Sequence, residues 1–282
     1  VQPTGDAAAD TTAIQTAINA GGTVELGEGT FLINATLDVK SGVTVQGQGW
    51  EKTVIKAASG ASIRCAKVSG ASKLIGVTVT GGNTSSRGAG VLVAGGTVSW
   101  CCISNNTATG FNIYGAGVYI VKGTIDHSII AYNAAYQTGL GGGIGCHDAA
   151  GAVTLDTCLI YGNGAPNGKG GAIAAELGNY HKAVAIRNST IADNAQVYGD
   201  AEVYGDAKVC SNYFGPKFKE LGVNHVDVEQ WFLQMKDTAS FPLFPRTGTH
   251  WSNIASLYVA DSVIRYIVEL MNATRTNEYI GR

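Results

Sequence analysis

The stretch VSWCCISNN, residues 98–106, recurs in altered form as IDHSIIAYN at 125–133, LDTCLIYGN at 155–163 and IRNSTIADN at 186–194. Each copy alternates apolar and polar residues and ends on an asparagine, and the copies begin 27, 30 and 31 residues apart. A glycine phrase precedes each copy: GAGV at 88–91, GAGV at 115–118, GGGI at 141–144 and GGAI at 170–173. A regular period of this length is typical of a solenoid, in which each repeat packs only on its neighbours.

Branched apolar residues occupy equivalent places in the four copies: Val98, Ile125, Leu155 and Ile186, then Ile103, Ile130, Ile160 and Ile191. Stacked in register, they predict inward ladders, the core of a parallel coil. We expect the asparagines at 106, 133, 163 and 194 to stack as well, each side chain bonding the turn backbone of the next coil. Three strands per coil and repeats of this length predict an all-β fold, a single-stranded right-handed parallel β-helix.

The β-helix is expected to cover residues 1–212. Residues 10–21 predict a helical cap at its N-terminal end, with Thr12 and Gln15 as a capping box and a stop at Gly21. Short strands are predicted at 23–26, 30–33, 36–39 and 43–46. NAQVYGDAEVYGDAKV at 194–209 has a strict period of six and is interpreted as a hexapeptide-like continuation of the solenoid. Residues 213–282 predict a small α-helical C-terminal appendage, with helices at 226–235 and 254–272.

Composition limits the partners. The 39 glycines follow the repeat and indicate tight turns, and the net charge of −2 gives no general attraction for nucleic acid or an anionic membrane. No apolar stretch is long enough to predict a transmembrane segment. The N-terminus lacks a signal-peptide pattern, so a secreted or cell-surface protein would be present here in its mature form.

The six cysteines form no CxxC pair and show no zinc spacing. Cys101 and Cys158 are equivalent but two repeats apart, about 9–10 Å, which is too far for a disulfide. We interpret the cysteines as small buried apolar residues; a disulfide from Cys146 to a neighbour is the alternative. No cluster of acidic residues suggests a calcium site, so we expect no metal and no cofactor.

The first 50 residues, with DTTAIQTAIN at 10–19, GGTVELGEGTFLI at 21–33 and SGVTVQGQG at 41–49, resemble the N-terminal region of the pectate-lyase-like superfamily. Lyases, hydrolases, epimerases and phage tailspikes share that fold. The repeats from 88 to 194 look like those of bacterial surface β-helix proteins, including polymorphic autotransporter passengers with GGAI motifs. This resemblance implies a bacterial surface protein.

VDVEQWFLQMKDTASFPLFPRTGTHWS at 226–252, within residues 218–272, looks like the C-terminal half of the SGNH-type sugar O-acetyltransferases related to alginate acetylation. That family uses an Asp-x-His-Trp motif. His250-Trp251 match, but Gly248 stands at the Asp position and the segment with the nucleophilic serine is absent. A histidine without its Asp and Ser partners cannot run this chemistry, so a vestigial or structural fragment is expected.

Candidate catalytic residues fall in two groups. Asp126, Asp156 and Arg187 are equivalent residues of successive repeats, and two carboxylates one coil apart, about 5 Å, fit retaining glycoside cleavage. His147-Asp148 resembles the His-Asp pairs with which β-helix epimerases and lyases transfer the C5 proton of uronates. The interpretation that the sequence favours is a solvated strand face for Asp126 and Asp156, because the polygalacturonase signatures are missing. For His147-Asp148 it favours a loop without a site, because an isolated His-Asp dipeptide is a weak signal. The candidate substrate-binding residues are Trp100, His127, Lys169, Tyr132 and Tyr161.

The sequence therefore favours a secreted or cell-surface bacterial β-helix protein with a structural, adhesive or glycan-contacting role. A polysaccharide or cell-surface glycan is the expected partner, and assembly into homo-oligomers or filaments is a further possibility. The alternative is a polysaccharide lyase, hydrolase or epimerase acting in a groove along the coils.

Overall fold

The computed structural model describes residues 1–147, 151–176, 184–192, 197–199, 201–204 and 208–209. The chain divides into two compact units, Val1–Tyr213 and Phe214–Arg282, and every described residue belongs to the first unit. The helices predicted at 226–235 and 254–272, and the segment that resembles the acetyltransferases, lie outside the described residues.

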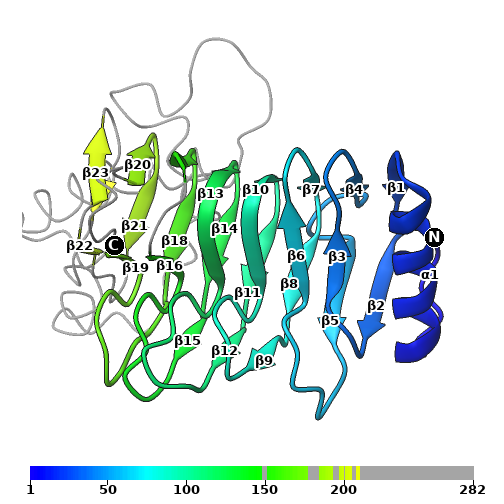
Figure 1. The fold of residues 1–282 in the computed structure, drawn as a ribbon, viewed down its shortest axis with the longest axis horizontal. Helices are drawn as coiled ribbons and strands as arrows, with labels where there is room; N and C mark the ends of the chain where they lie inside the picture. The colour runs from blue at the N-terminus through cyan, green and yellow to red at the C-terminus, as the bar shows by residue number, and fades with distance from the viewer. Residues whose placement is uncertain (148–150, 177–183, 193–196, 200, 205–207, 210–282) are drawn as a thin grey trace, which may run out of the picture. The chain divides into compact units, whose positions relative to one another are not determined.

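The first unit is a parallel β-helix, as the sequence predicts (Figure 1). Its described strands all pair in parallel, and they form three sheets, of 13, 8 and 3 strands. The first sheet contains β1 (Thr23–Glu25), β3 (Leu37–Val39), β4 (Thr44–Gln46), β6 (Ala66–Ser69), β7 (Lys73–Ile75), β10 (Val91–Ser99), β13 (Val118–Asp126), β16 (Ile144–His147), β17 (Val153–Asp156), β19 (Ile173–Glu176), β20 (Val184–Arg187), β22 (Val197–Gly199) and β23 (Ala201–Tyr204).

The second sheet takes one strand from each coil: β2 (Gly29–Ile33), β5 (Thr53–Ala57), β8 (Thr78–Thr80), β11 (Cys102–Ser104), β14 (Ile129–Ala131), β18 (Leu159–Tyr161), β21 (Thr190–Ala192) and β24 (Lys208–Val209). The third contains β9 (Asn83–Thr84), β12 (Thr107–Ala108) and β15 (Ala134–Ala135). Strands β22, β23 and β24, from the period-six stretch, pair with β19, β20 and β21 and so continue the coil.

The inward ladders are in the predicted register. Val98 pairs with Ile125, which pairs with Leu155 and then Ile186, and Ile103, Ile130, Ile160 and Ile191 pair in the same way. All eight side chains are fully buried. Burying a large aliphatic side chain stabilises a fold by about 1.5–3 kcal/mol, so each coil depends on its neighbours for its core.

The buried asparagines form a ladder, but its direction differs from the prediction. The Asn106 Nδ2 donates to the Val79 carbonyl of the preceding coil and to the Asn133 Oδ1 of the next coil. The side chain of Asn133 bonds the backbone of the preceding coil. Its Oδ1 accepts from the Asn106 N–H, and its Nδ2 donates to the Ile103 carbonyl. Asn106 and Asn133 each therefore bond the backbone of the coil before them and the side chain of the coil after them. Asn194 lies outside the described residues.

The glycine phrase and the asparagine ladder depend on each other. A Cβ on Gly117 would lie 2.7 Å from the Asn133 Nδ2, and one on Gly90 would lie 2.8 Å from the Asn106 Nδ2. The second glycine of the GAGV phrase thus leaves the space that the amide fills. This contact explains why the two phrases recur together in the sequence.

The described cysteines are free thiols, and Cys146 forms no disulfide. Cysteine and serine alternate at one position of successive coils, in the order Cys101, Ser128, Cys158 and Ser189. The Cys101 N–H donates to the Ser128 Oγ, and the Cys158 N–H donates to the Ser189 Oγ. Burial raises the pKa of the Cys101 and Cys158 thiols to about 12. These thiols are therefore buried packing residues, as the first interpretation of the sequence expects.

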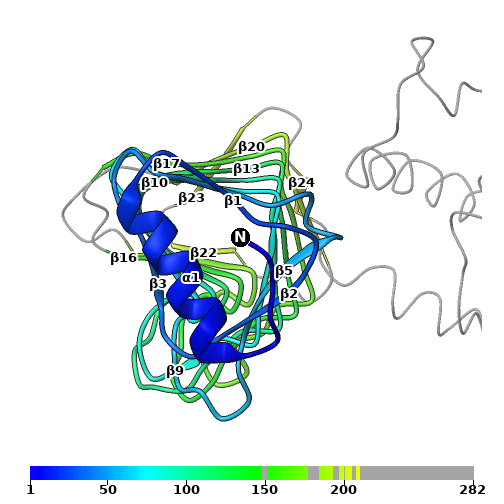
Figure 2. The same ribbon diagram turned by 90° about the vertical axis from the view of Figure 1, so that its right-hand side faces the viewer.

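Helix α1 (Ala7–Ala20) lies across the N-terminal end of the coil (Figure 2). It begins earlier than predicted, because Asp6 rather than Thr12 accepts from a helical N–H, that of Ala9. The predicted capping box does not form, since the Gln15 Oε1 instead accepts from the Asp38 N–H of β3. Buried Asp10 accepts from the Leu32 N–H and so ties the helix to β2.

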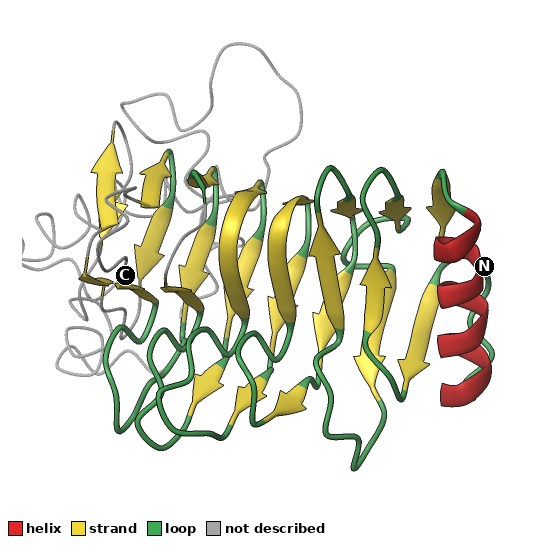
Figure 3. Ribbon diagram, viewed as in Figure 1, coloured by secondary structure: helices red, strands yellow, loops and turns green. Residues whose placement is uncertain are grey.

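Ile14 and Ile18 bury the apolar face of α1, and Gly21, with a φ of 86°, ends it as predicted. Figure 3 shows α1 in red, and the other described residues form strands and loops. In the described part of the chain, no helix combines the length and the apolar character needed to cross a membrane.

Candidate functional site

One residue from each of four successive coils forms a column just before the glycine phrase: Arg87, Tyr114, Leu140 and Lys169. The glycine that follows each of them has a φ between 67° and 71°. The column is held by the hydrogen bonds from the Gly115 N–H to the Leu140 carbonyl, 2.8 Å, and from the Gly141 N–H to the Lys169 carbonyl, 2.9 Å. Three coil steps of about 4.8 Å place the ends of this column about 14 Å apart.

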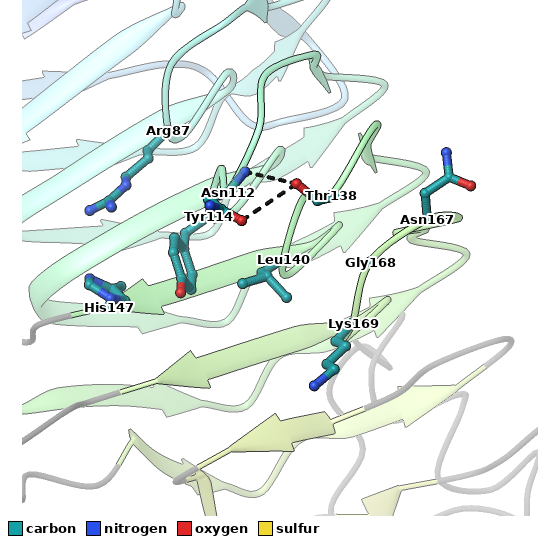
Figure 4. Close-up of a pocket in the computed structure, with 9 residues that line it drawn as sticks. All are labelled: Arg87, Asn112, Tyr114, Thr138, Leu140, His147, Asn167, Gly168 and Lys169. Carbon is teal, nitrogen blue, oxygen red and sulfur yellow. Dashed lines mark hydrogen bonds between the residues drawn. The ribbon is translucent and has the colours of Figure 1, made fainter.

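The column lines a pocket of about 580 Å³ (Figure 4). Its nine lining residues are Arg87, Asn112, Tyr114, Thr138, Leu140, His147, Asn167, Gly168 and Lys169. None of these nine described residues is acidic, although the chain as a whole carries a net charge of −2. Two permanent cations and an imidazole therefore give this pocket a charge opposite to that of the whole protein.

Two tyrosines hold the Arg87 guanidinium. Its Cζ lies 5.0 Å from the centroid of the Tyr114 ring and 5.1 Å from that of the Tyr119 ring. The Arg87 Nη1 donates to the Tyr119 hydroxyl at 2.8 Å, and that hydroxyl donates to the His147 carbonyl at 2.9 Å. Among the described residues the guanidinium makes no other hydrogen bond, so most of its five donors remain for a ligand.

His147 ends β16 and contacts Tyr114, with ring centroids 4.6 Å apart and tilted by 42°. Tyr114 is only 5% exposed, so its ring forms the floor between Arg87 and His147. Glu176 of β19 pairs with His147 in register. A buried tyrosine beside a histidine places two groups that can donate or accept protons next to the Arg87 guanidinium.

A second pocket of about 560 Å³ shares the lining residues Arg87 and Asn112 with the first, so the two pockets adjoin at these residues. Arg64 lines it and donates to the Arg87 carbonyl through Nε at 3.2 Å, which fixes the backbone beneath the Arg87 side chain. Burial lowers the pKa of Arg64, which nevertheless remains a cation at neutral pH. Phe111, 75% exposed, forms the rim.

The structure separates the two predicted catalytic groups. Asp126, Asp156 and Arg187 end β13, β17 and β20 in register, outside the lining of both pockets. His147 lies beside the first half of β13, because β16 pairs there. Tyr119, in that half, is seven residues from Asp126, about 23 Å of extended chain. Asp148 lies outside the described residues.

The predicted substrate-binding residues lie in three places. Trp100 and His127 stack at the turn after the first sheet, with ring centroids 4.5 Å apart, and Lys169 lines the pocket. Tyr132, directly after β14, and Tyr161, the last residue of β18, meet edge to face at 5.1 Å. Burial, and then Tyr132, raise the pKa of Tyr161 to about 12.

Sequence reasoning missed Arg87 and the pairing of Tyr114 with His147. The sequence signal that could have found them is the position just before each glycine phrase. The residue type varies there, from Arg to Tyr, Leu and Lys, while the phrase itself is repeated. Among the described residues, no group of three or more His, Cys, Asp and Glu side chains is arranged to hold a metal ion.

No family model and no curated protein sequence matches the chain. Among solved structures, the A-module of the mannuronan C-5 epimerase AlgE4 from Azotobacter vinelandii is similar, with 17% identity and a TM-score of 0.32, over 71% of this chain and 72% of that one. A likeness at this level says nothing about activity. The fold assignment rests on the strand pairing described above.

Proposed function

We propose that this protein binds an acidic polysaccharide along the coil axis, in the pocket between Arg87 and Lys169. The observation that carries the proposal is the composition of the lining: cations, amides and hydroxyls without a carboxylate among the nine described residues. Carboxylates of a uronic acid would pair with the guanidinium and the ammonium group, and sugar hydroxyls would meet the amides of Asn112 and Asn167.

The geometry favours a polymer over a single sugar. The cationic ends of the column are three coils apart, about 14 Å, and a saccharide unit is comparable in length with one coil step. The second pocket extends the groove beyond Arg87. A chain with a negative charge on each unit can therefore contact Arg87 and Lys169 at the same time.

Calorimetry with the full chain tests this function, with oligouronates and neutral oligosaccharides of the same length as ligands. Arg87→Gln and Lys169→Gln are each expected to weaken oligouronate binding about tenfold, or about 1.4 kcal/mol, while Lys56→Gln, an exposed lysine of β5, should not. Added salt should weaken binding to the parent protein. No binding of the oligouronates, or unchanged oligouronate affinity in both Arg87→Gln and Lys169→Gln, would refute the proposal.

Tyr119→Phe provides a finer test of how Arg87 is positioned. The phenyl ring keeps the cation–π contact, but the hydrogen bond from the Arg87 Nη1 is lost. We expect oligouronate affinity to fall several-fold, with far-UV circular dichroism unchanged. An unchanged affinity would show that Arg87 does not need this partner.

A catalytic role is the second candidate, and the contact of Tyr114 with His147 favours it. If a uronate carboxylate is neutralised by Arg87 or Lys169, its C5 proton becomes more acidic, and an imidazole or phenol beside it is suited to proton transfer. The products would be an epimerised unit or a chain cleaved by elimination. Deuterium uptake at C5 from D₂O, abolished in His147→Gln or Tyr114→Phe, would support this role, and no uptake would exclude it.

The proposal includes a secreted or cell-surface location and an adhesive role, with the glycan as the bound partner. The buried thiols are compatible with that location, because a thiol whose pKa is raised to about 12 by burial is inert toward oxidation. Protease digestion of the protein on intact cells tests the location. Protection until the cells are lysed would contradict it.

A further inference from the structure

A second ladder runs along the turn after the first sheet, where each coil places one residue in the left-handed backbone region. The φ values are 63° at Gly76, 55° at Trp100, 44° at His127, 53° at Thr157 and 47° at Asn188. Glycine adopts this conformation freely, whereas tryptophan and a β-branched threonine adopt it at a cost in free energy. Trp100 is nevertheless 49% exposed, so burial of its ring does not fully compensate for that cost. Retained strain of this kind is found where side chains contact ligands.

The aromatic rings of this turn form a platform. Trp100 and His127 stack with ring centroids 4.5 Å apart and an interplanar angle of 18°. The His127 Nδ1 lies 3.4 Å from the Asp126 Oδ1, an oxygen that also accepts from the Ser99 hydroxyl. On the other side of Trp100 the ladder continues with Gly76, which has no side chain to stack on the indole.

Two carboxylate oxygens lie beside this platform. Asp126 and Asp156 pair in register on neighbouring strands, about 4.8 Å apart. The Asp156 Oδ1 accepts from the Thr157 hydroxyl at 3.0 Å and from the Asn188 Nδ2 at 2.9 Å. Within the described part of the chain, no hydrogen bond engages the Oδ2 of either aspartate. Each therefore retains an oxygen that can accept a hydroxyl.

We propose that Trp100, His127, Asp126 and Asp156 form a separate binding site for a neutral, hydroxyl-rich glycan. The C–H face of a pyranose would lie on the Trp100 ring, and its hydroxyls would donate to the two Oδ2 atoms. The carboxylates repel a uronate, so this site disfavours the acidic ligand proposed for the pocket of Arg87 and Lys169. Arg187 pairs with Asp156 in register and is the adjoining cation. The site does not depend on the function proposed for that pocket.

The test uses the full chain and a panel of neutral oligosaccharides (glucan, galactan, mannan and xylan fragments), with binding measured by calorimetry and by tryptophan fluorescence. Trp100→Asn removes the ring but suits the left-handed backbone, and it should weaken binding at least tenfold. Trp100→Phe keeps a ring, so binding should stay within about threefold while the fluorescence change on binding is lost. Asp126→Asn/Asp156→Asn should weaken binding as well.

Tyr136→Ala is the matched control, because it removes an aromatic ring of similar exposure, 47%, elsewhere on the surface. It should leave neutral-glycan binding unchanged, and an excess of oligouronate should not displace the neutral ligand. The proposal is overturned if no neutral oligosaccharide binds, if Trp100→Asn binds like the parent protein, or if oligouronates compete. Loss of oligouronate binding at the pocket alone would refute the proposed function and leave this site standing.

Discussion

Replacing Asn133 with alanine tests whether the asparagine ladder holds the coils together. The Asn133 amide makes four hydrogen bonds. Its Oδ1 accepts from the Asn106 N–H and Nδ2, both at 3.0 Å, and its Nδ2 donates to the Ile103 carbonyl at 2.9 Å and to the Asn163 Oδ1 at 3.0 Å. Asn133 is 1% exposed, so water does not replace these bonds readily.

The expected cost follows from these contacts. Four hydrogen bonds at about 1 kcal/mol each give about 4 kcal/mol, and the buried Asn106 N–H that is left without its acceptor adds about 1–2 kcal/mol. Asn133→Ala should therefore lower the free energy of unfolding by about 5–6 kcal/mol. Because whole domains are stable by about 5–15 kcal/mol, this single change should leave the fold marginal.

The assay is urea unfolding of the full chain followed by far-UV circular dichroism, with the midpoint and the slope fitted separately. Asn83→Ala is the matched control, because Asn83 is an exposed asparagine of β9. It should change the free energy of unfolding by less than about 0.5 kcal/mol. A loss below about 1 kcal/mol for Asn133→Ala would refute the assigned role of the ladder.

Two further predictions concern the repeat and the buried thiols. Gly115→Ala should cost at least about 2 kcal/mol, because φ is 67° and the new Cβ would lie 1.9 Å from the Val118 carbonyl oxygen. Urea unfolding should also show that the free energy of unfolding falls as the pH rises above 9. The thiols of the unfolded chain ionise there, whereas burial raises the pKa of the folded thiols to about 12. The double variant Cys101→Ser/Cys158→Ser should roughly halve that fall. The thiols concerned are Cys65, Cys101, Cys146 and Cys158.

The controls for these two predictions come from the same chain. A Cβ on Gly164 would meet nothing within 4 Å, so Gly164→Ala should change stability by less than about 1 kcal/mol. Equal effects of alanine at Gly115 and Gly164 would contradict the close-contact argument. For the thiols, the folded state keeps the proton and the unfolded state loses it, so the stabilisation is complete below pH 9 and is lost between pH 9 and 12. An unfolding midpoint independent of pH between 8 and 10 would show that the thiols are not buried.

The candidate site was less accessible from the sequence than the fold was. Asp126, Asp156 and Arg187 were paired correctly in register from their positions in the repeat. Sequence spacing could not show that His147 lies beside another part of β13, because the long strands β10 and β13 are succeeded by two separate strands, β16 and β17, in the next coil. It also did not reveal Asp6 as the N-cap, because Thr12 with Gln15 offers an equally good local pattern.

The sequence by itself determined the coil: repeated Ile, Val, Asn and Gly positions specify contacts between neighbouring repeats, and such contacts depend only on the period. The tertiary structure alone decided which variable residues share a pocket. Arg87 and Lys169 are 82 positions apart in the sequence, yet only about three coil steps apart in space. Loop lengths and backbone bends set that proximity, and neither follows the period that the repeats encode.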